Sequence, residues 1–107
     1  MSGKGNQVLI VDDDNQLRDL LVEYFVHNGF DVHSASSATE PLEQLKKGSL
    51  KPSLIISDIN MPGIDGLEFV QQIAKINPDI PVILIRASSE LKSNFIERST
   101  WINWKMS

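Results

Sequence analysis

The chain has 107 residues, 41% of them hydrophobic and 22% charged, which fits a single globular domain over residues 1–107 and excludes a disordered or fibrous protein. The absence of cysteine excludes a disulfide framework and a cysteine-ligated metal. A net charge of -4 without clustered Lys and Arg argues against direct nucleic-acid binding, and the lack of an apolar leader or of a membrane-length apolar run leads us to expect a cytoplasmic protein.

The chain begins with a predicted strand and a predicted helix. Residues 7–11, QVLIV, form a continuous apolar run, which is typical of a strand covered on both faces in a parallel sheet. From Leu17 to Phe25, apolar residues recur at helical spacing and form one stripe. Gly29 is placed to end this helix at its C-terminal side.

A second strand and a shorter helix follow. Residues 31–35, DVHSA, alternate between apolar and polar side chains, which predicts a strand at the edge of the sheet. The next helix is expected over residues 40–47, with Thr39 as its N-cap and Gly48 at its end.

The rest of the chain continues the alternation. Apolar runs at residues 53–57 and 81–85 predict two further central strands. A third helix is expected between them over residues 67–76, and a fourth is expected to begin near Ser89. Because strand and helix alternate throughout, the sequence indicates an α/β fold with right-handed crossovers.

Acidic residues directly follow two of the predicted central strands. Asp12 and Asp13 come after residues 7–11, and Asp58 comes after residues 53–57. The carboxyl ends of parallel strands meet at one edge of a sheet, where ligands bind, so we expect these side chains to converge. Close carboxylates repel one another unless a cation holds them, and Mg²⁺ needs only a few protein oxygens. We therefore expect a Mg²⁺ site at this edge.

Other polar residues have simpler interpretations. Asp14 is expected to cap the first helix, because a side-chain oxygen at that position accepts hydrogen bonds from the first helical turn. Asp65 and Gly66 are typical of an ordinary turn before the third helix. His27 and His33 lie far in sequence from the acids, and we assign them no role.

Three stretches together resemble the receiver domains of two-component response regulators. They are VLIVDDDNQLRDLL, LIISDINMPGIDGLEFV and IPVILIRA, and the resemblance extends over residues 6–87. It implies a flavodoxin-like, doubly wound parallel sheet of strand order 2-1-3-4-5 with five helices. It also implies a signalling reaction in which a histidine kinase or a phosphotransfer protein donates a phosphoryl group from phosphohistidine to an aspartate.

The resemblance assigns roles to residues of these stretches. Asp58 aligns with the phosphoacceptor, and Asp12 and Asp13 align with the acid pair that binds Mg²⁺ together with Asp58. Asn60 aligns with the residue that binds the metal through its backbone carbonyl. Gly63 is expected to adopt a positive φ in the turn that follows. These assignments agree with the chemistry, since phosphoryl transfer needs positioning and neutralised phosphoryl oxygens.

Two positions depart from the family pattern. Arg86 stands where receivers carry a Ser or Thr whose hydroxyl bonds the phosphoryl group, so the usual conformational switch is in question. Lys105 is a candidate for the phosphate-binding lysine, but Met106 follows it where the family has Pro. The fifth strand is therefore only weakly indicated, around Trp101 and Trp104.

The sequence ends without a fifth helix, so we expect one face of the sheet to lose a cover. An uncovered apolar face favours an interface. We therefore expect a homodimer, with exchange of C-terminal elements as one route to it.

Two further functions remain open at this point. One is a pseudo-receiver, an interaction or dimerisation module of the same fold without a working phospho-switch, which Arg86 favours. The other is an Mg²⁺-dependent phosphatase with an aspartyl nucleophile, although its D-x-D-x-[TV] signature is absent. The phosphorelay receiver is the first hypothesis, because the acidic triad Asp12, Asp13 and Asp58 is intact.

Overall fold

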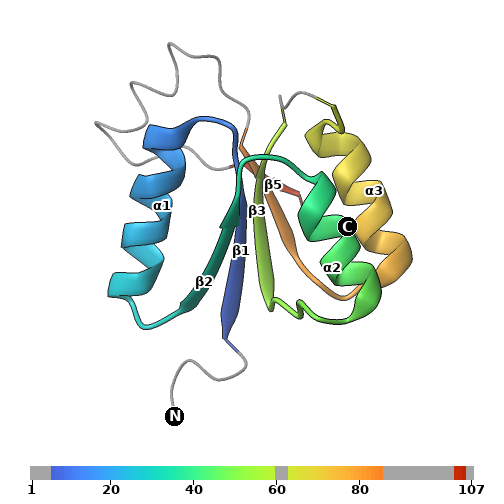
Figure 1. Ribbon diagram of the computed structural model, residues 1–107, viewed down its shortest axis with the longest axis horizontal. Coiled ribbons are helices and arrows are strands. Elements are labelled where there is room, and N and C mark those ends of the chain that lie inside the picture. The colour runs from blue at the N-terminus through green and yellow to red at the C-terminus, as the bar shows by residue number, and fades with distance from the viewer. Residues whose placement is uncertain (1–5, 60–62, 86–102, 106–107) are drawn as a thin grey trace.

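The computed structural model describes residues 6–59, 63–85 and 103–105 (Figure 1). Strands and helices alternate along the chain, as the sequence predicts. In chain order the elements are β1 (Gln7–Val11), α1 (Asn15–His27), β2 (Asp31–Ala35), α2 (Thr39–Lys47), β3 (Leu54–Asp58), α3 (Gly66–Ile76), β4 (Val82–Ile85) and β5 (Asn103–Lys105).

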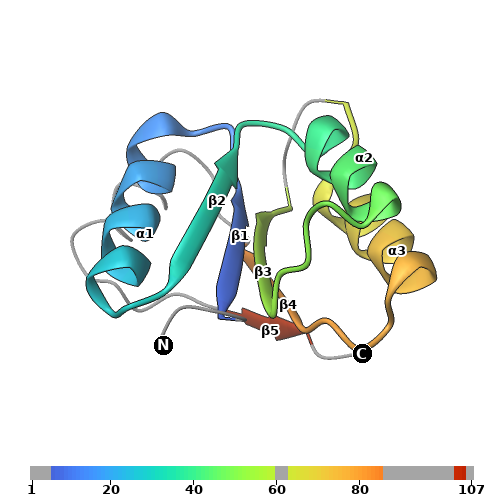
Figure 2. The same ribbon diagram turned by 60° about the horizontal axis from the view of Figure 1, so that its bottom comes forward.

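The five strands form one sheet in the order β2-β1-β3-β4-β5. β1 pairs in parallel with β2 and with β3, and β3 pairs in parallel with β4. Helix α1 covers one face of this sheet, while α2 and α3 cover the other (Figures 1 and 2). The predicted doubly wound α/β sheet is therefore confirmed for its first four strands, with β2 at the edge.

Each face of the sheet has its own hydrophobic core, which explains why the central strands are continuous apolar runs. Successive residues of a strand point to opposite faces, so both sets must be apolar. On the α1 face the buried core residues are Val8, Ile10, Leu17, Leu21, Ile56, Ile83 and Ile85. On the α2 and α3 face they are Leu9, Val11, Ala38, Leu42, Leu45, Leu50, Ile55, Phe69, Ile73, Val82 and Leu84.

Helix α1 begins as predicted, at a cap formed by Asp14. Its side chain Oδ1 accepts a hydrogen bond from the backbone N–H of Leu17 at 3.1 Å. Asn28 is the C-cap, and Gly29 follows with a φ of 89°, in the left-handed region that glycine adopts at low cost. Leu17 and Leu21 are the buried residues of this helix, so its cap orients an anchored element directly after Asp12 and Asp13.

Replacing Asp14 by Ala should lower the free energy of unfolding by about 1 kcal/mol, because one N–H of the first turn loses its acceptor. Urea denaturation followed by circular dichroism measures this change. Asp19→Ala is the matched control, since it removes the same charge from an exposed position of α1 that caps nothing, and it should change the free energy of unfolding by less than about 0.5 kcal/mol. Equal losses in the two variants would contradict the capping role.

The predicted cap of the second helix is wrong. Thr39 is the first residue of α2, and the N-cap position belongs to Ala38, which forms no side-chain cap hydrogen bond. Ala38 already has helical dihedral angles, φ -86° and ψ -15°, and it is buried in the core of the α2 and α3 face. Burial of a small apolar side chain therefore sets the start of this helix, whereas Gly48 ends it with a φ of 79°, as expected.

The fifth strand occupies the predicted position in the sheet, but it has the opposite direction. β5 pairs antiparallel with β4, so that Leu84 lies opposite Asn103 and Val82 lies opposite Lys105. The prediction of a parallel sheet is therefore wrong for this strand. A parallel neighbour requires the chain to return to the far end of β4, whereas an antiparallel neighbour can begin where β4 ends. Antiparallel edge strands on parallel sheets are common.

The described residues contain three helices, and none of them is long and apolar enough to cross a membrane. The fourth helix predicted near Ser89 lies outside the described residues.

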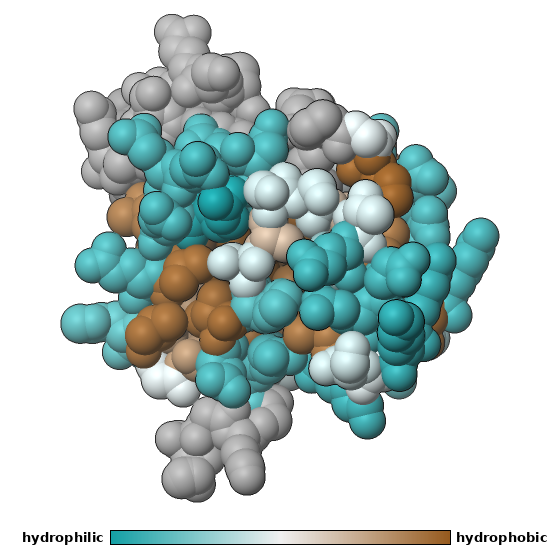
Figure 3. Space-filling model, viewed as in Figure 1, coloured by the Kyte–Doolittle hydropathy of each residue, from teal (hydrophilic) through white to brown (hydrophobic). Residues whose placement is uncertain are grey.

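The uncovered apolar face on which the predicted homodimer depends is not seen at β4. All four residues of this strand are buried. Tyr24, Val26 and Leu67 are large hydrophobic side chains that are exposed in the described part of the chain. On the face seen in Figure 3, hydrophobic residues form patches that hydrophilic residues interrupt. The dimer, with or without exchange of C-terminal elements, stays a prediction.

Candidate functional site

The acidic residues after β1 and β3 converge, as the sequence predicts. These two strands are parallel neighbours, with Val11 opposite Ser57, so both end at the same edge of the sheet. One side-chain oxygen from each of Asp12, Asp13 and Asp58 lies within 4.8 Å of the others. We call these three residues the acidic cluster. Asp12 is 1% exposed and Asp58 is 0% exposed, whereas Asp13 is exposed and brings the cluster to the surface.

Asp12 is held by contacts from two elements. Its backbone N–H donates to the carbonyl oxygen of Ala35 at 3.1 Å, which extends the pairing of β1 with β2. Its Oδ1 accepts a hydrogen bond from the backbone N–H of Asp14 at 2.9 Å. Its carbonyl oxygen accepts a hydrogen bond of 2.7 Å from Nη1 of Arg18, whose Nη2 donates to Oδ1 of Asn15 at 2.7 Å. The guanidinium of Arg18 thus links α1 to the end of β1.

Asp58 is the last residue of β3, a central strand that pairs with β1 as far as Ser57 and with β4 as far as Asp58 itself. It lies opposite Ile85 of β4, and the N–H of the following residue, Ile59, donates to the carbonyl oxygen of Ile85 at 3.0 Å. The hydroxyl of Ser57 donates to the carbonyl oxygen of Asp58 at 3.1 Å. Because a central strand cannot shift without breaking pairing on two sides, the position of Asp58 relative to Asp12 and Asp13 is set by the fold.

The oxygen donors of the cluster fit a small, hard divalent cation. Three carboxylates within 4.8 Å repel one another as anions, and a cation bound among them offsets this repulsion. Mg²⁺ prefers oxygen ligands and retains several water molecules, so a few protein carboxylates are sufficient for it. The structure therefore contains an acidic site of the kind that the sequence predicts.

The described part of the structure does not support a place at this cluster for the other predicted site residues. Asn60 and Arg86 lie outside the described residues, so their roles stay predictions. The backbone of Lys105 pairs with Val82, at the opposite end of β4 from Ile85, which is the neighbour of Asp58. This pairing gives no support to a phosphate-binding role for Lys105, which also stays a prediction.

Sequence reasoning missed two residues that contact the backbone of the cluster. Arg18 binds the carbonyl oxygen of Asp12, and Gly66 packs against the backbone of Asp58. The only feature of the sequence that could indicate this contact of Arg18 is its position in the first turns of α1, within reach of the end of β1. The sequence predicts an ordinary turn at Gly66, whereas the structure shows it as the first residue of α3.

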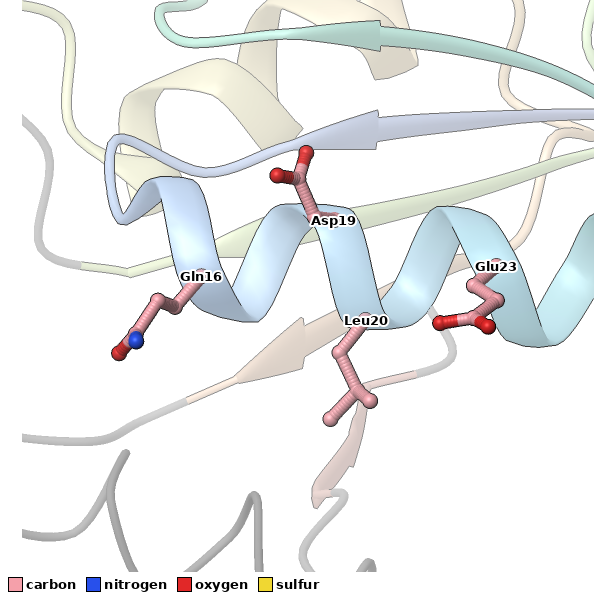
Figure 4. Close-up of a pocket in the computed structure, with 4 residues that line it drawn as sticks. All are labelled: Gln16, Asp19, Leu20 and Glu23. Carbon is pink, nitrogen blue, oxygen red and sulfur yellow. The ribbon is translucent and has the colours of Figure 1, made fainter.

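A pocket on α1 does not belong to the acidic cluster. It is lined by Gln16, Asp19, Leu20 and Glu23. Figure 4 shows Gln16, Leu20 and Glu23 directed to one side of the helix and Asp19 to another. Since none of the three clustered acids lines this pocket, we assign the chemistry to the cluster and not to the pocket.

Comparison with known proteins identifies the family. The family model for the response regulator receiver domain matches residues 8–98. The chain is 38% identical over 84 residues to the C4-dicarboxylate transport transcriptional regulatory protein DctD of Rhizobium meliloti, and equally similar to the DNA-binding transcriptional regulator NtrC of Escherichia coli. Each match covers 78% of this chain and 18% of the relative, so the chain spans about a fifth of the length of these curated relatives.

Solved structures agree with this result. The response regulator TrrA of Thermotoga maritima, solved in complex with Mg²⁺-BeF, is 37% identical, with a TM-score of 0.69 over 83% of this chain and 76% of that chain. A CheY-like receiver domain protein of Methanospirillum hungatei is 26% identical, with a TM-score of 0.72 over 88% of this chain and 75% of that chain. The family match, the relatives and the shared fold all point to one class of signalling domain. The chain therefore belongs to the receiver domain family of two-component response regulators.

Proposed function

We propose that this receiver domain accepts a phosphoryl group on Asp58 from the phosphohistidine of a histidine kinase or of a phosphotransfer protein, with Mg²⁺ bound at the acidic cluster. The observation that carries this proposal is the approach of the Asp12, Asp13 and Asp58 oxygens to within 4.8 Å at the end of two central strands. That arrangement supports the proposal, because the acceptor carboxylate and the metal ligands that we assign would then lie at one edge of the sheet.

The proposed reaction requires little covalent chemistry from the protein. A carboxylate oxygen of Asp58 forms the new bond to phosphorus while the bond from phosphorus to the histidine nitrogen breaks. The product on the protein is an acyl phosphate. Mg²⁺, when bound, neutralises charge on the phosphoryl oxygens. Asp12 and Asp13 would hold it together with Asp58, and the carbonyl of Asn60 is the further ligand expected from the family pattern.

The fixed backbone of the cluster supports this role. Phosphoryl transfer depends mainly on the positions of donor and acceptor. Asp58 lies in a strand paired on both sides, and Asp12 is bound through its N–H, its carbonyl and its carboxylate. Among the relatives, TrrA was solved with Mg²⁺-BeF, which makes the same kind of ligand reasonable for this chain.

The proposal treats residues 1–107 as one receiver domain. We also propose a cytoplasmic location for it. Arg86 stands at the position where the family has Ser or Thr. The proposal therefore covers acceptance of the phosphoryl group and makes no claim about the conformational response to it.

The test is the intact mass of the protein after incubation with Mg²⁺ and acetyl phosphate. We expect the parent to gain the mass of one phosphoryl group and Asp58→Asn to gain none, because the amide cannot form the acyl phosphate. Asp19→Asn is the matched control at an exposed acid outside the cluster, and it should be labelled like the parent. An unlabelled parent would favour the pseudo-receiver, and equal labelling of Asp58→Asn would place the acceptor elsewhere.

A further inference from the structure

We propose that Gly66 is a positioning residue for the phosphoacceptor: the first residue of α3 lies so close to the backbone of Asp58 that only glycine leaves the acceptor strand in place. This inference rests on the proposed function of Asp58. Gly66 has no side chain that could contact the metal or the phosphoryl donor, so its role would be indirect.

The approach of the two segments is very close. A Cβ atom built on Gly66 would lie 2.5 Å from the carbonyl oxygen of Asp58 and 2.6 Å from the Cα of Ile59. It would also lie 3.1 Å from the carbonyl carbon of Asp58. Real Cβ atoms essentially never approach other heavy atoms to less than 3.0 Å. The opposing atoms belong to the backbone, so no flexible side chain can rotate away.

Hydrogen bonds hold the segment after Asp58 in this place. The N–H of Gly66 donates to the carbonyl oxygen of Ile59 at 2.8 Å, and the N–H of Ile59 donates to the carbonyl oxygen of Ile85 at 3.0 Å. Ile59 is therefore bound by β4 through its N–H and by the start of α3 through its carbonyl. Gly66 and β4 together fix the chain directly after the acceptor carboxylate and directly before Asn60.

Backbone conformation does not explain the glycine. Gly29, Gly48 and Gly63 have positive φ values, and Gly66 is not among the positive-φ glycines. A Cβ atom at those three positions would meet nothing within 4 Å. In a helix, glycine is less favourable than alanine, so helix formation does not require it either. Among the glycines that the structure describes, the close approach to Asp58 thus distinguishes Gly66 from Gly29, Gly48 and Gly63.

Addition of a methyl group must move one of two anchored segments. α3 is anchored by Phe69 and Ile73, which are buried in the core. The end of β3 is paired with both β1 and β4. Any shift of the Asp58 backbone moves its carboxylate relative to Asp12 and Asp13. Since a misplacement of about 1 Å can cost roughly 100-fold in rate, a large effect on phosphorylation is expected without any loss of a reacting group.

The experiment compares Gly66→Ala with Asp65→Ala. Asp65 is the N-cap of α3, and its side chain accepts from the N–H of Glu68 at 2.9 Å, so Asp65→Ala weakens the same helix start without adding an atom beside Asp58. For each folded variant we would measure the rate constant of phosphorylation by acetyl phosphate, the Mg²⁺ dissociation constant, and the urea midpoint. We expect Gly66→Ala to slow phosphorylation by about tenfold or more, and Asp65→Ala by less than about twofold.

Phosphorylation of the parent and the Mg²⁺ titration together distinguish a failure of the positioning role from a failure of the proposed function. If the parent is labelled and Gly66→Ala is labelled within about twofold of it, the positioning role is overturned. Equal slowing in Gly66→Ala and Asp65→Ala would also overturn it, because both would then act through the helix start. If the parent is not labelled, the proposed function fails, and weaker Mg²⁺ binding by Gly66→Ala alone still decides whether this residue positions the cluster.

A folding defect in Gly66→Ala does not prevent the test. Sucrose favours the compact state because it is excluded from the protein surface, so the same comparison can be made in sucrose for all variants and the parent. Under those conditions a folded Gly66→Ala protein with the parent's rate constant and Mg²⁺ affinity would overturn the proposal. A folded but slow variant would support it.

Discussion

Asp13→Asn is expected to weaken Mg²⁺ binding strongly while leaving the fold intact. Asp13 is the exposed member of the acidic cluster, so its replacement leaves no cavity in the core. Removal of outer-shell partners of a bound metal typically costs roughly 10- to 100-fold in affinity, and loss of a direct carboxylate ligand should cost at least as much. We therefore expect the Mg²⁺ dissociation constant to rise by about tenfold or more.

Stability with and without Mg²⁺ gives a measurement that does not depend on phosphorylation. A ligand that binds only the folded state adds about 2.7 kcal/mol to the free energy of unfolding at 100 times its dissociation constant, and about 1.4 kcal/mol at ten times. At a Mg²⁺ concentration about 100 times the parent's dissociation constant, the parent should therefore gain about 1.3 kcal/mol more than Asp13→Asn, because this concentration is only about ten times the variant's dissociation constant.

The difference between the two proteins should disappear when Mg²⁺ is removed by a chelator, because only the bound ion stabilises the parent more than the variant. Asp19→Asn, an exposed acid outside the cluster, should gain as much from Mg²⁺ as the parent. The same Mg²⁺-dependent gain in Asp13→Asn and in the parent would show that Asp13 does not hold the ion.

The central part of the fold could be predicted because its signals are local. The continuous apolar runs around Ile10, Ile56 and Ile83 reflect strands that are covered on both faces, and the structure buries alternate residues of each strand in two different cores. The acidic cluster was predictable for a related reason. Parallel strands end at a common edge, so acids that directly follow two neighbouring strands must come together whatever the intervening helices do.

The features that could not be predicted depend on contacts between distant segments. The direction of β5 depends on which end of β4 the chain returns to, and a strand of three residues carries no periodicity that could reveal it. The contact of Gly66 with Asp58 appears only when α3 is placed against β3. The bond from Arg18 to the carbonyl oxygen of Asp12 involves a backbone acceptor, which no residue type marks.

The predicted N-cap of α2 is wrong for a different reason. A Thr before an amphipathic segment is a good N-cap by residue type, but the side chain of Ala38 is 1% exposed and packs into the core. Packing of this alanine places the helix start one residue earlier than the capping preference does. Tertiary burial therefore overrides a local preference worth about 1 kcal/mol.

Phe69→Ala is expected to have the largest effect on stability in the described part of the chain. Phe69 is 0% exposed and belongs to the core between the sheet and helices α2 and α3. Truncation of a buried Phe to Ala typically costs about 3–5 kcal/mol, since both the transfer free energy and the contacts around the resulting cavity are lost. Domains of this kind are stable by about 5–15 kcal/mol, so the urea midpoint should fall steeply.

Leu67→Ala is the matched control on the same helix. Leu67 is 54% exposed, so its truncation should change the free energy of unfolding by less than about 0.5 kcal/mol. Urea denaturation of both variants measures the difference. Equal losses at positions 67 and 69 would mean that α3 does not bury the face that the structure assigns to it.

The Mg²⁺-dependent gain in stability of Phe69→Ala tells whether this core and the acidic cluster are independent. The cluster is built on the ends of β1 and β3, whereas Phe69 fills space between the sheet and α3. Effects at sites without shared partners usually add within about 0.5 kcal/mol, so the truncated variant should gain as much from Mg²⁺ as the parent within that margin. A smaller gain would show that the anchoring of α3 reaches the cluster. The path available for such coupling is the contact between Gly66 and the backbone of Asp58.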